Sequence, residues 1–306
     1  MYLEKRKIGK RTKYYLIHSY RDKGDVKKIR RYLGVDLSNG ELEPARRKAE
    51  QDILSVLDEL STQIFLFQLS EQQIDKLNSY SKNIKVAHLD WKRFTENFVY
   101  NTNAIEGSSV ERDEVQGILK KATTRNPDEK ETKGVAEAVN YIRKTKEELS
   151  VALINKIHLI CFRESKKFAG KIRTVEVVIR DRQGKIIHQG IPAAQLKHAL
   201  KDLISWYHIN KDKFRPLVLA AIIHNQFEHI HPFVDGNGRV GRLLMNYILL
   251  QKGYPPINIS LQDRQEYYHT LQEYSANQDI KQTVRFLVKQ YDKTLRQVTT
   301  KHFTKK

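Results

Sequence analysis

The stretch of sequence that decides the fold is HPFVDGNGRVGR, residues His231–Arg242. Its two glycines, Gly236 and Gly238, allow the backbone to turn tightly, and an apolar run with helical spacing follows as far as Leu250. The stretch therefore predicts a loop that leads into the N-terminus of a buried helix. Because a helix N-terminus carries free N–H groups and the positive end of the helix dipole, we expect an anion to bind there.

The polar side chains of this stretch suit phosphate chemistry. Arg239 and Arg242 are three residues apart, so both lie on one side of the first helical turn and can reach the same anion. His231 can take up a proton near neutral pH, and Asp235 offers the carboxylate that Mg²⁺ prefers. Imidazole, carboxylate and paired arginines at the start of a helix together predict metal-assisted work on a phosphate.

At these residues the chain resembles the Fic family, whose signature is HPFx[D/E]GNGRxxR, and every fixed position of that signature is filled. Residues 224–233 are similar to the helix that leads into the family's loop, and residues 170–173 to the start of its strand and flap region. Residues 264–271 resemble the helix that closes the adenine side of its pocket. The resemblance covers residues 90–295, and it implies a mainly α fold, a Fic-type helical bundle with a β-hairpin flap.

The activity implied by the resemblance is that of a nucleotidyltransferase. A Fic loop with this sequence usually moves AMP from Mg·ATP to a Ser, Thr or Tyr hydroxyl of a target protein, with pyrophosphate leaving. A related variant that transfers a phosphate carries Ala and Lys in this loop, whereas the region around Gly238 is intact here. The resemblance implies that the catalytic residues are His231 (the general base), Asn237, Arg239 and Arg242, that ATP contacts Gly236, Asn237, Gly238, Arg239 and Arg242, and that Asp235 holds Mg²⁺.

Two further sets of site residues follow from the same resemblance. Tyr267 and Tyr268 would line the adenine pocket, although a tyrosine on an apolar helix face also suits simple core packing. The flap would clamp a segment of the target protein by strand addition. Its expected docking residues are His188, Gln189, Gly190 and Ile191, and the alternative is an ordinary surface loop.

A second motif predicts how such an enzyme is held inactive. Residues 102–107, Thr-Asn-Ala-Ile-Glu-Gly, resemble the inhibitory pattern [S/T]xxxE[G/N] of the family, upstream of the catalytic loop. The resemblance implies that Glu106 pairs with Arg242, which a carboxylate can do through two parallel hydrogen bonds. An arginine held in this way is unavailable to the γ-phosphate of ATP. In an alternative that stays open, Glu106 positions water and the enzyme removes AMP from its target.

Composition agrees with this interpretation. A chain of 306 residues with 40% apolar and 30% charged residues is typical of a globular protein with a substantial core. The single cysteine, Cys161, excludes an intramolecular disulfide and is compatible with a reducing compartment. No secretion signal or run of transmembrane length is recognised. We therefore expect a cytoplasmic protein without membrane contact.

The positive charge is concentrated towards the ends of the chain. The net charge is +19, and residues 1–36 alone hold twelve Lys and Arg against four Asp and Glu, a net of +8 (12 − 4). Alternation up to Leu33, with a turn at residues 22–25, predicts a small basic β-meander or hairpin. It resembles the basic β-hairpins that open some transposases and integrases, and it is a candidate contact for nucleic acid. The alternative for this segment is a solvated appendage. For the whole chain, a DNA-associated regulatory protein in which the Fic-like site is secondary stays open, as does self-association.

The remaining patterns give the order of the segments. We expect a basic β-appendage at 1–36, a helical connector at 37–89 with a second helical piece at 71–87, an inhibitory helix region at 90–109, the Fic core at 110–296 and a basic tail at 297–306. Helices are predicted at 134–148, 151–162, 195–209, 215–229, 238–252, 263–276 and 280–296, and extended chain at 173–190. The polar stretch Thr123–Lys133, with its Asn-Pro step, predicts an exposed loop.

Overall fold

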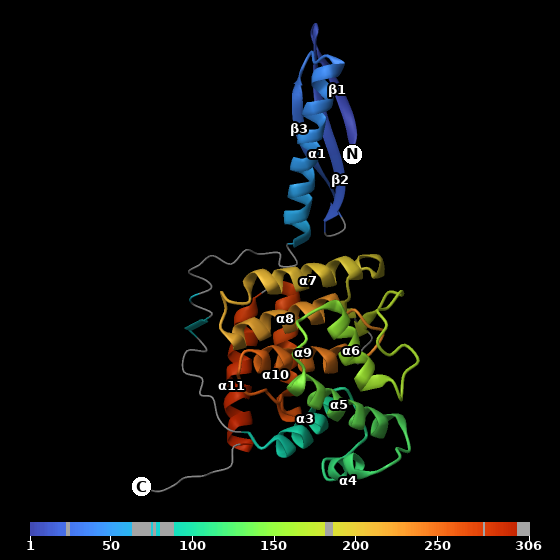
Figure 1. Ribbon diagram of the computed structural model, residues 1–306, viewed down its shortest axis with the longest axis vertical. Coiled ribbons are helices and arrows are strands. Elements are labelled where there is room, and N and C mark those ends of the chain that lie inside the picture. Colours follow the sequence, from blue (N-terminus) through green and yellow to red (C-terminus); the bar gives the residue numbers. More distant parts are fainter. Residues whose placement is uncertain are drawn as a thin grey trace. The chain divides into compact units, whose positions relative to one another are not determined.

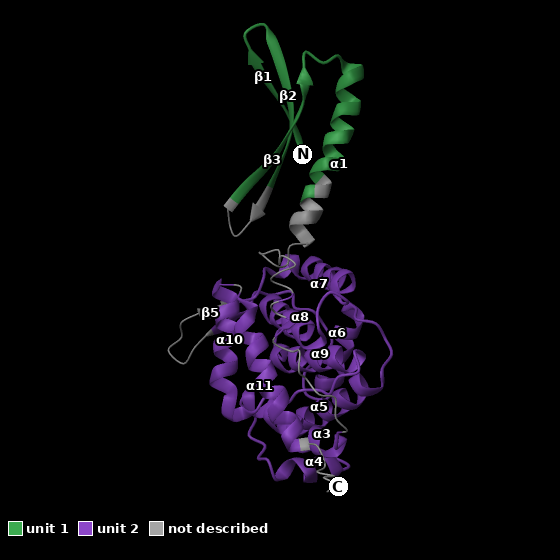
Figure 2. Ribbon diagram, turned by 90° about the vertical axis from the view of Figure 1, so that its left-hand side faces the viewer, with its two compact units in different colours: residues 1–63 green, residues 64–306 purple. Residues whose placement is uncertain are grey.

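The computed structural model describes residues 1–22, 25–62, 75, 78–79, 89–180, 186–277 and 279–298. The chain divides into two compact units, Met1–Gln63 and Ile64–Lys306, which Figure 2 shows in different colours. Among the helices of the described residues, none has the length and apolar character needed to cross a membrane.

The first unit is a three-stranded antiparallel sheet with one long helix (Figure 1). Strands β1 (Tyr2–Ile8), β2 (Arg11–Asp22) and β3 (Asp25–Val35) pair in the order β1-β2-β3. This confirms the small β-structure predicted from the alternating residues. A short loop leads to α1 (Asn39–Thr62), whose first turn is fixed by Ser38, because its N–H and hydroxyl both donate to the carboxylate of Glu41.

Helix α1 covers one face of this sheet. Leu16 and Ile29 of the sheet pack against Ala49 and Ile53 of the helix, and all four residues are buried. The boundary between the two units follows Gln63, inside the segment predicted as a connector. The helical piece predicted at 71–87 lies almost entirely outside the described residues, as does most of the predicted basic tail.

The second unit is a helical bundle with one small hairpin (Figure 1). Its helices are α3 (Trp91–Ile105), α4 (Glu114–Lys120), α5 (Pro127–Lys144), α6 (Val151–Phe162), α7 (Leu196–Asn210), α8 (Pro216–Ile230), α9 (Asn237–Gln251), α10 (Arg264–Asn277) and α11 (Ile280–Val298), with the short 3₁₀ turns η1 (Ala193–Gln195) and η2 (Leu261–Asp263). Strands β4 (Val178–Arg180) and β5 (Ile186–Gln189) pair antiparallel and form the expected hairpin. The residues between them lie outside the described part of the chain. The predicted fold class, a mainly α bundle with a β-hairpin and a β-appendage, is confirmed.

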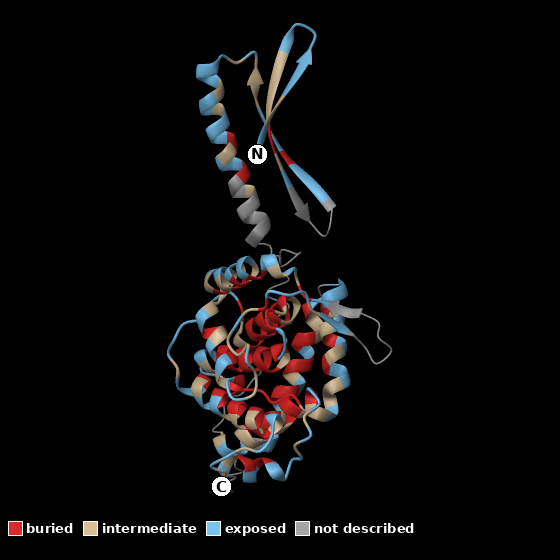
Figure 3. Cartoon of the chain, turned by 90° about the vertical axis from the view of Figure 1, so that its right-hand side faces the viewer, coloured by how far each residue is buried: buried red, intermediate tan, exposed pale blue. Residues whose placement is uncertain are grey.

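Helices α8 and α9 form the centre of this bundle (Figure 1), and Figure 3 shows the buried residues gathered in its interior. Every residue of α8 from Leu217 to Phe227 is buried, and so is every residue of α9 from Arg239 to Leu249. The loop between them belongs to the stretch HPFVDGNGRVGR. That loop is therefore carried by two helices that are buried along most of their length.

Helix ends from α6 to α11 lie within two residues of the predicted ones, but two predictions around α5 are wrong. The helix predicted at 134–148 begins seven residues earlier and ends at Lys144. The stretch Thr123–Lys133 is not an exposed loop, because α5 begins inside it at Pro127. The side chain of Asn126 caps this helix by accepting a hydrogen bond from the N–H of Glu129 at 2.9 Å. Proline suits the first helical position because its missing N–H would have no partner there. The polar composition concealed a helix start whose residues Glu129 and Glu131 are buried.

Candidate active site

The loop between α8 and α9 has a left-handed backbone residue at each end. His231 follows α8 with a φ of 52°, and Gly236 precedes α9 with a φ of 85°. A Cβ at Gly236 would overlap the ring of Phe162, so glycine is required there both for conformation and for space. The loop therefore turns sharply at two fixed points, and the predicted turn at the helix start is present.

Asn237, the first residue of α9, holds the loop closed. Its side-chain Oδ1 accepts a hydrogen bond from the N–H of Phe233 at 2.9 Å, and its Nδ2 donates to the carbonyl of Phe233 at 2.8 Å. Both ends of the buried amide are therefore used inside the loop. The side chain of Asn237 is therefore not available to an anion. An anion could instead be bound by the backbone N–H groups of Asn237 and the half-buried Gly238 at the start of α9.

His231 is fixed by Arg173, a residue that sequence analysis did not single out for the site. Nε of Arg173 donates to the carbonyl of His231 at 2.8 Å, and its other nitrogens donate to the carbonyls of Val175 at 2.7 Å and Ile191 at 2.6 Å. Nδ1 of His231 lies 3.3 Å from the carbonyl of Glu228. If Nδ1 donates its proton to that carbonyl, Nε2 is the nitrogen that can act as a base.

Arg242 is buried at the second turn of α9 and is bound to the segment that carries the inhibitory motif. Its Nη2 donates to Oε1 of Glu106, at the C-terminal end of α3, at 2.6 Å. This is one hydrogen bond in place of the two parallel bonds expected, because Nε of Arg242 is turned to Thr102. Its Nε donates to the hydroxyl of Thr102 at 2.7 Å, and Nη2 also donates to the Thr102 carbonyl at 3.1 Å. Burial alone disfavours the charged form, but Glu106 and then Tyr267 raise the pKa of Arg242 above its ordinary value. Arg242 is therefore a cation with a committed partner.

A second carboxyl group, that of the half-buried Glu228, lies near this pair. Its Oε1 is packed against Gly241, where an added Cβ would overlap it. Burial raises the pKa of Glu228 to about 8; the charge of Arg242 opposes this rise and that of Glu106 adds to it. Glu228 is therefore mostly protonated at neutral pH, which leaves Glu106 as the carboxylate that neutralises Arg242.

Arg239 belongs to a four-residue ionic network on the other side of the loop. It pairs with the buried Glu131 of α5, and its guanidinium lies 4.5 Å from the ring centre of Phe162. Lys166 lies between two carboxylates, 2.9 Å from Oε1 of Glu131 and 2.7 Å from Oδ2 of Asp235. Partial burial opposes ionisation of Asp235, but the hydrogen bond and charge of Lys166 keep the pKa of Asp235 below its ordinary value.

His158 of α6 contacts the backbone of the loop between α8 and α9. The N–H of Gly170 donates to its Nδ1 at 2.8 Å, so Nε2 carries the proton and donates to the carbonyl of Asp235 at 3.0 Å. The imidazole also stacks on Phe233, with ring centres 3.9 Å apart. Burial lowers the pKa of His158 to about 4. His158 is therefore a neutral structural histidine that holds the backbone of the predicted metal ligand.

The donor set around Asp235 fits a magnesium ion that is shared with phosphates. Within the described residues no group of three His, Cys, Asp or Glu side chains could hold a metal, and Mg²⁺ in nucleotide sites commonly uses one or two carboxylates with phosphate oxygens. The side chain of Asp235 is 53% exposed, and its Oδ2 already attracts the ammonium of Lys166. Asp235 is therefore a single, partly exposed carboxylate whose two oxygens both have partners, since Oδ1 accepts a hydrogen bond from the N–H of Gly236 at 2.6 Å.

The two tyrosines predicted for the adenine pocket lie on α10 and differ in environment. Tyr267 is 1% exposed, and its hydroxyl lies 3.0 Å from Nε2 of His224 and 3.4 Å from Nη1 of Arg242. Tyr268 is half-buried and donates from its hydroxyl to the carbonyl of Ile105 at 3.1 Å. Tyr267 therefore supports Arg242 from the core, and Tyr268 is the residue with surface left for a ligand.

The predicted flap residues lie at the end of β5 and just after it. The backbone of β5 pairs with β4 through His188 opposite Ile179 and Gln189 opposite Val178. Gly190 is buried, and an added Cβ would lie 2.7 Å from Nη2 of Arg173 and 3.1 Å from Cβ of His231. The hairpin therefore ends directly beside the candidate base.

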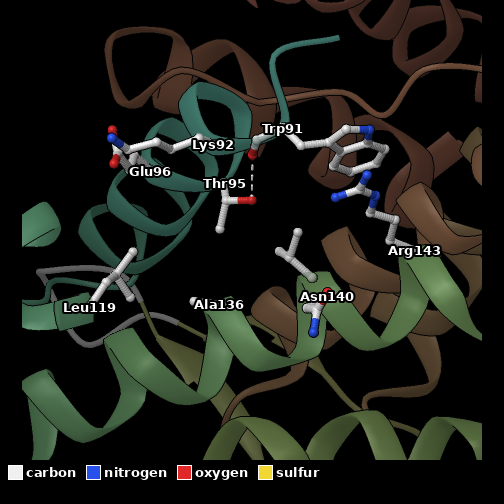
Figure 4. Close-up of a pocket in the computed structure, with 9 residues that line it drawn as sticks. Trp91, Lys92, Thr95, Glu96, Leu119, Ala136, Asn140 and Arg143 are labelled. Carbon is white, nitrogen blue, oxygen red and sulfur yellow. Dashed lines mark hydrogen bonds between the residues drawn. The ribbon is translucent and has the colours of Figure 1, made fainter. Parts of the chain in front are cut away.

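A cavity of about 270 Å³ lies away from this loop, between α3 and α5 (Figure 4). Trp91 and Arg143 form one side of it, with the guanidinium 4.3 Å from the ring centre. The other labelled side chains around it are Lys92, Thr95, Glu96, Leu119, Ala136 and Asn140. None of the predicted site residues lines it, so it is separate from the phosphate site.

Sequence reasoning missed the residues that bind the loop from outside the motif. Glu131, Lys166, His158 and Arg173 come from four segments and follow no shared spacing. The only local signal was the helix cap at Asn126, which would have placed Glu131 on a helix. Thr102 stood inside the inhibitory pattern, but its contact with Arg242 was not predicted.

Comparisons with known proteins find similarity to one family. Residues 148–249 match the family model of the Fic/DOC family. The protein adenylyltransferase Fic of Nematostella vectensis is 29% identical over 246 residues, which are 74% of this chain and 56% of that protein. The protein of the same name from Aedes aegypti is 30% identical over 264 residues, 82% of this chain and 50% of that protein. The chain thus spans about half the length of these curated relatives.

Solved structures agree on the fold. A Fic domain containing signaling protein from Bacteroides thetaiotaomicron is 24% identical with a TM-score of 0.62, over 74% of this chain and 94% of that chain. Fic-1 from C. elegans is also 24% identical, with a TM-score of 0.58 over 85% of this chain and 76% of that chain. The region that matches the Fic/DOC family model, residues 148–249, contains the loop between α8 and α9.

Proposed function

We propose that this chain is a protein adenylyltransferase, which moves AMP from Mg·ATP to a Ser, Thr or Tyr hydroxyl of a target protein, and that Glu106 keeps it weakly active. The observation that carries the proposal is the pair of Arg242 and Glu106, 2.6 Å apart at the anion site of α9. Arg242 is suited to bind a phosphate, and Glu106 binds the guanidinium group that the phosphate would need. The names of the relatives from Nematostella vectensis and Aedes aegypti support the same activity.

The proposed reaction gives each loop residue a role. Nε2 of His231 takes the proton of the target hydroxyl while that oxygen forms a bond to the α-phosphorus of ATP. The bond from the α-phosphorus to the bridging oxygen breaks, and pyrophosphate leaves with its electron pair. The N–H groups at the start of α9 hold the α-phosphate, and Arg239 faces the β-phosphate. When bound at Asp235, Mg²⁺ supplies positive charge to the phosphate oxygens.

Inhibition has a simple electrostatic cause. While Glu106 holds Arg242, a γ-phosphate placed at the same guanidinium would meet the carboxylate, and two anions at close range repel. ATP then binds with its phosphates displaced from the line of attack on the α-phosphorus. Release of Glu106 restores Arg242 to the γ-phosphate. The flap beside His231 would present the target segment by strand addition, through His188, Gln189, Gly190 and Ile191.

The proposal includes two further expectations. The reaction needs ATP and Mg²⁺, which the cytoplasm supplies, so the expected compartment is the cytoplasm. Self-association would be one way to control α3, because a second copy that contacts this helix would change how firmly Glu106 is held. The activity assigns no role to the basic residues 1–36.

The experiment that tests the proposal is intact-mass measurement after incubation with Mg²⁺ and ATP. Glu106→Gly should gain the mass of one AMP by self-modification, the unchanged protein should gain little, and His231→Ala should gain none even when combined with Glu106→Gly. The matched control is Glu164→Gly, an exposed glutamate whose loss should leave self-modification as in the unchanged protein. Equal labelling of Glu106→Gly and Glu164→Gly would refute the inhibitory role.

Two other results would redirect the proposal. A gain of one phosphate mass in place of AMP would keep the site but replace the chemistry. Loss of AMP from a target modified in advance, dependent on Glu106, would show that the enzyme works in the removing direction. Absence of any mass change, tested also with GTP, CTP and UTP and with cell extract as a source of targets, would contradict the proposed activity.

A further inference from the structure

The face of the N-terminal sheet opposite α1 carries a different set of side chains from the face that packs on α1. Strand alternation places Leu16 and Ile29 under α1, so Glu4, Tyr15 and Tyr32, which lie opposite one another across the three strands, point to the other face. The contacts agree with this assignment. The rings of Tyr15 and Tyr32 are 5.4 Å apart, and both Arg6 and Arg30 are 3.3 Å from the Glu4 carboxylate. Figure 2 shows α1 along one side of the three strands only.

This open face, defined by strand alternation, is strongly basic. Its cations come from all three strands: Arg6, Arg11, Lys13, Lys28 and Arg30. Four of the five are exposed and Lys13 is half-buried, and Glu4 is the carboxylate on the described part of this face. Ile17, on the same face of β2, is only 1% exposed, so the accessible surface is that of the surrounding polar and aromatic side chains. Residues on the α1 side of the edge strands add further positive charge, so both long edges of the sheet are basic. Such a surface attracts a polyanion rather than a neutral partner.

The shape of the face favours double-stranded DNA. Neighbouring strands are about 4.8 Å apart, so the outer strands lie about 10 Å from one another, which is less than the roughly 12 Å width of a major groove. Arg6 and Arg30, which lie beside Tyr15 halfway along the sheet, would face the base edges, and cations nearer the strand ends, such as Arg11 and Lys28, would face phosphates. Tyr2 and Tyr32 are 48% and 56% exposed and supply apolar contact.

Single-stranded nucleic acid fits less well. A single-strand platform needs aromatic rings whose faces are open for stacked bases. The central ring here, that of Tyr15, is already covered by the guanidinium groups of Arg6 and Arg30, 5.7 Å and 5.6 Å from its centre, and by Tyr32. We propose that the open face of the β1-β2-β3 sheet binds double-stranded DNA through its major groove, independently of the Fic site.

The test is a binding measurement on the full chain as a function of salt. The probe is a labelled duplex of about 20 base pairs, which at about 3.4 Å per pair is longer than β2. Arg11→Gln combined with Lys28→Gln removes two exposed charges from the face. The expected result is affinity at least about tenfold weaker at 0.1 M salt and a salt dependence lower by about 1.8 in the log–log slope, the value for two lost phosphate contacts.

Matched variants distinguish this surface from positive charge elsewhere on the protein. Lys144→Gln combined with Lys146→Gln removes the same charge from exposed positions of the second unit and should change neither quantity. His231→Ala should bind the duplex like the unchanged protein, so failure of the proposed enzyme activity would not be mistaken for failure of this inference. Thermal unfolding of each variant checks that the fold is retained.

Three outcomes would overturn the inference. The first is that no duplex binding is detected at low salt. Under that condition a basic protein that binds DNA without sequence preference is expected to have a Kd of about 10⁻⁶ M or tighter. The second is a preference for the single strand of the same sequence over the duplex, which would point to base stacking. The third is displacement of the duplex by polyglutamate at equal charge concentration, which would point to an acidic protein as the partner.

Discussion

The ammonium of Lys166 lies 2.7 Å from Oδ2 of Asp235, the residue proposed to bind Mg²⁺. The same ammonium is 2.9 Å from Glu131, which also pairs with Arg239. Lys166 thus joins the proposed metal ligand to the proposed phosphate ligand. The ammonium of Lys166 therefore neutralises the carboxylate of Asp235, to which a bound Mg²⁺ would otherwise contribute the positive charge.

The first prediction concerns this competition. Lys166→Met keeps the length of the side chain and removes its charge, so the affinity for a divalent cation without nucleotide should rise about tenfold, the equivalent of about 1.4 kcal/mol. Calorimetric titration with Mn²⁺ or Mg²⁺ measures it directly. Lys167→Met changes the exposed neighbouring residue and is the control. If both variants bind the metal with equal affinity, Lys166 does not compete for Asp235.

The second prediction concerns the support of Arg242. Thr102→Val is nearly isosteric but removes the hydroxyl that accepts the Nε proton of Arg242 at 2.7 Å. A buried charged donor then lacks a partner, so the free energy of unfolding should fall by about 1–3 kcal/mol. In the Glu106→Gly background, self-modification should slow as well, because Thr102 no longer holds the guanidinium of Arg242 in the position needed to bind the γ-phosphate. Thr102→Ser retains the hydroxyl and should recover most of both quantities in urea unfolding and labelling assays.

The third prediction uses two helical glycines in different surroundings. Gly134 of α5 lies against the backbone carbonyl of Cys161 in α6, and an added Cβ would overlap that oxygen, whereas nothing lies within 4 Å of a Cβ at Gly117 of α4. Gly134→Ala should therefore destabilise the protein by about 1–3 kcal/mol. Gly117→Ala should stabilise it by about 0.5–1 kcal/mol, because alanine loses less backbone entropy. Chemical unfolding compares the two, and changes of the same sign would contradict the packing described.

The fourth prediction concerns pH. The folded-state pKa of His158, about 4, lies below the ordinary value of 6.5, so the unfolded chain takes up this proton first as the pH falls. The stability linked to His158 is therefore complete above pH 6.5 and is lost progressively towards pH 4. Buried His224, with a pKa lowered to about 3, acts in the same direction.

His158→Phe tests that linkage. It keeps a ring against Phe233 but removes the titrating group and its two hydrogen bonds. The variant should be less stable at pH 7, and its unfolding free energy should fall less steeply between pH 6.5 and 4. Urea unfolding at several pH values measures this slope. A slope equal to that of the unchanged protein would show that His158 is not the group responsible.

The sequence predicts well those features that depend on neighbours along the chain. The turn at Gly236, the start of α9 and the course of α6 to α11 follow from glycine conformation and helical periodicity, both of which are local. The start of α5 was equally local but was misassigned, because Asn126 and Pro127 suit a loop as well as a helix cap. Local patterns therefore predicted elements, and one ambiguous pattern led to the wrong element.

Contacts between distant segments were beyond such reasoning. Arg242 and Glu106 are 136 positions apart, and residue chemistry alone says only that an arginine at a helix start will find an anion. The choice of Glu106 came from the resemblance of a short pattern. Lys166 had no such pattern, since it is one of 55 Lys and Arg residues and its position beside Asp235 depends on how α6 meets the loop. The helix that follows the third strand was likewise expected as a helix but not as the cover of the sheet.

The hydrogen bond from Tyr268 to the carbonyl of Ile105 has a thermodynamic consequence under the proposed function. Ile105 directly precedes Glu106, so the wall of the nucleotide site and the inhibitory carboxylate are joined by one residue. Coupling free energies between two sites are reciprocal. A protein that binds α3 in a displaced position must therefore raise the affinity for correctly placed ATP, and ATP must tighten the hold of that protein by the same factor. The protein that releases Glu106 and the nucleotide would then bind cooperatively.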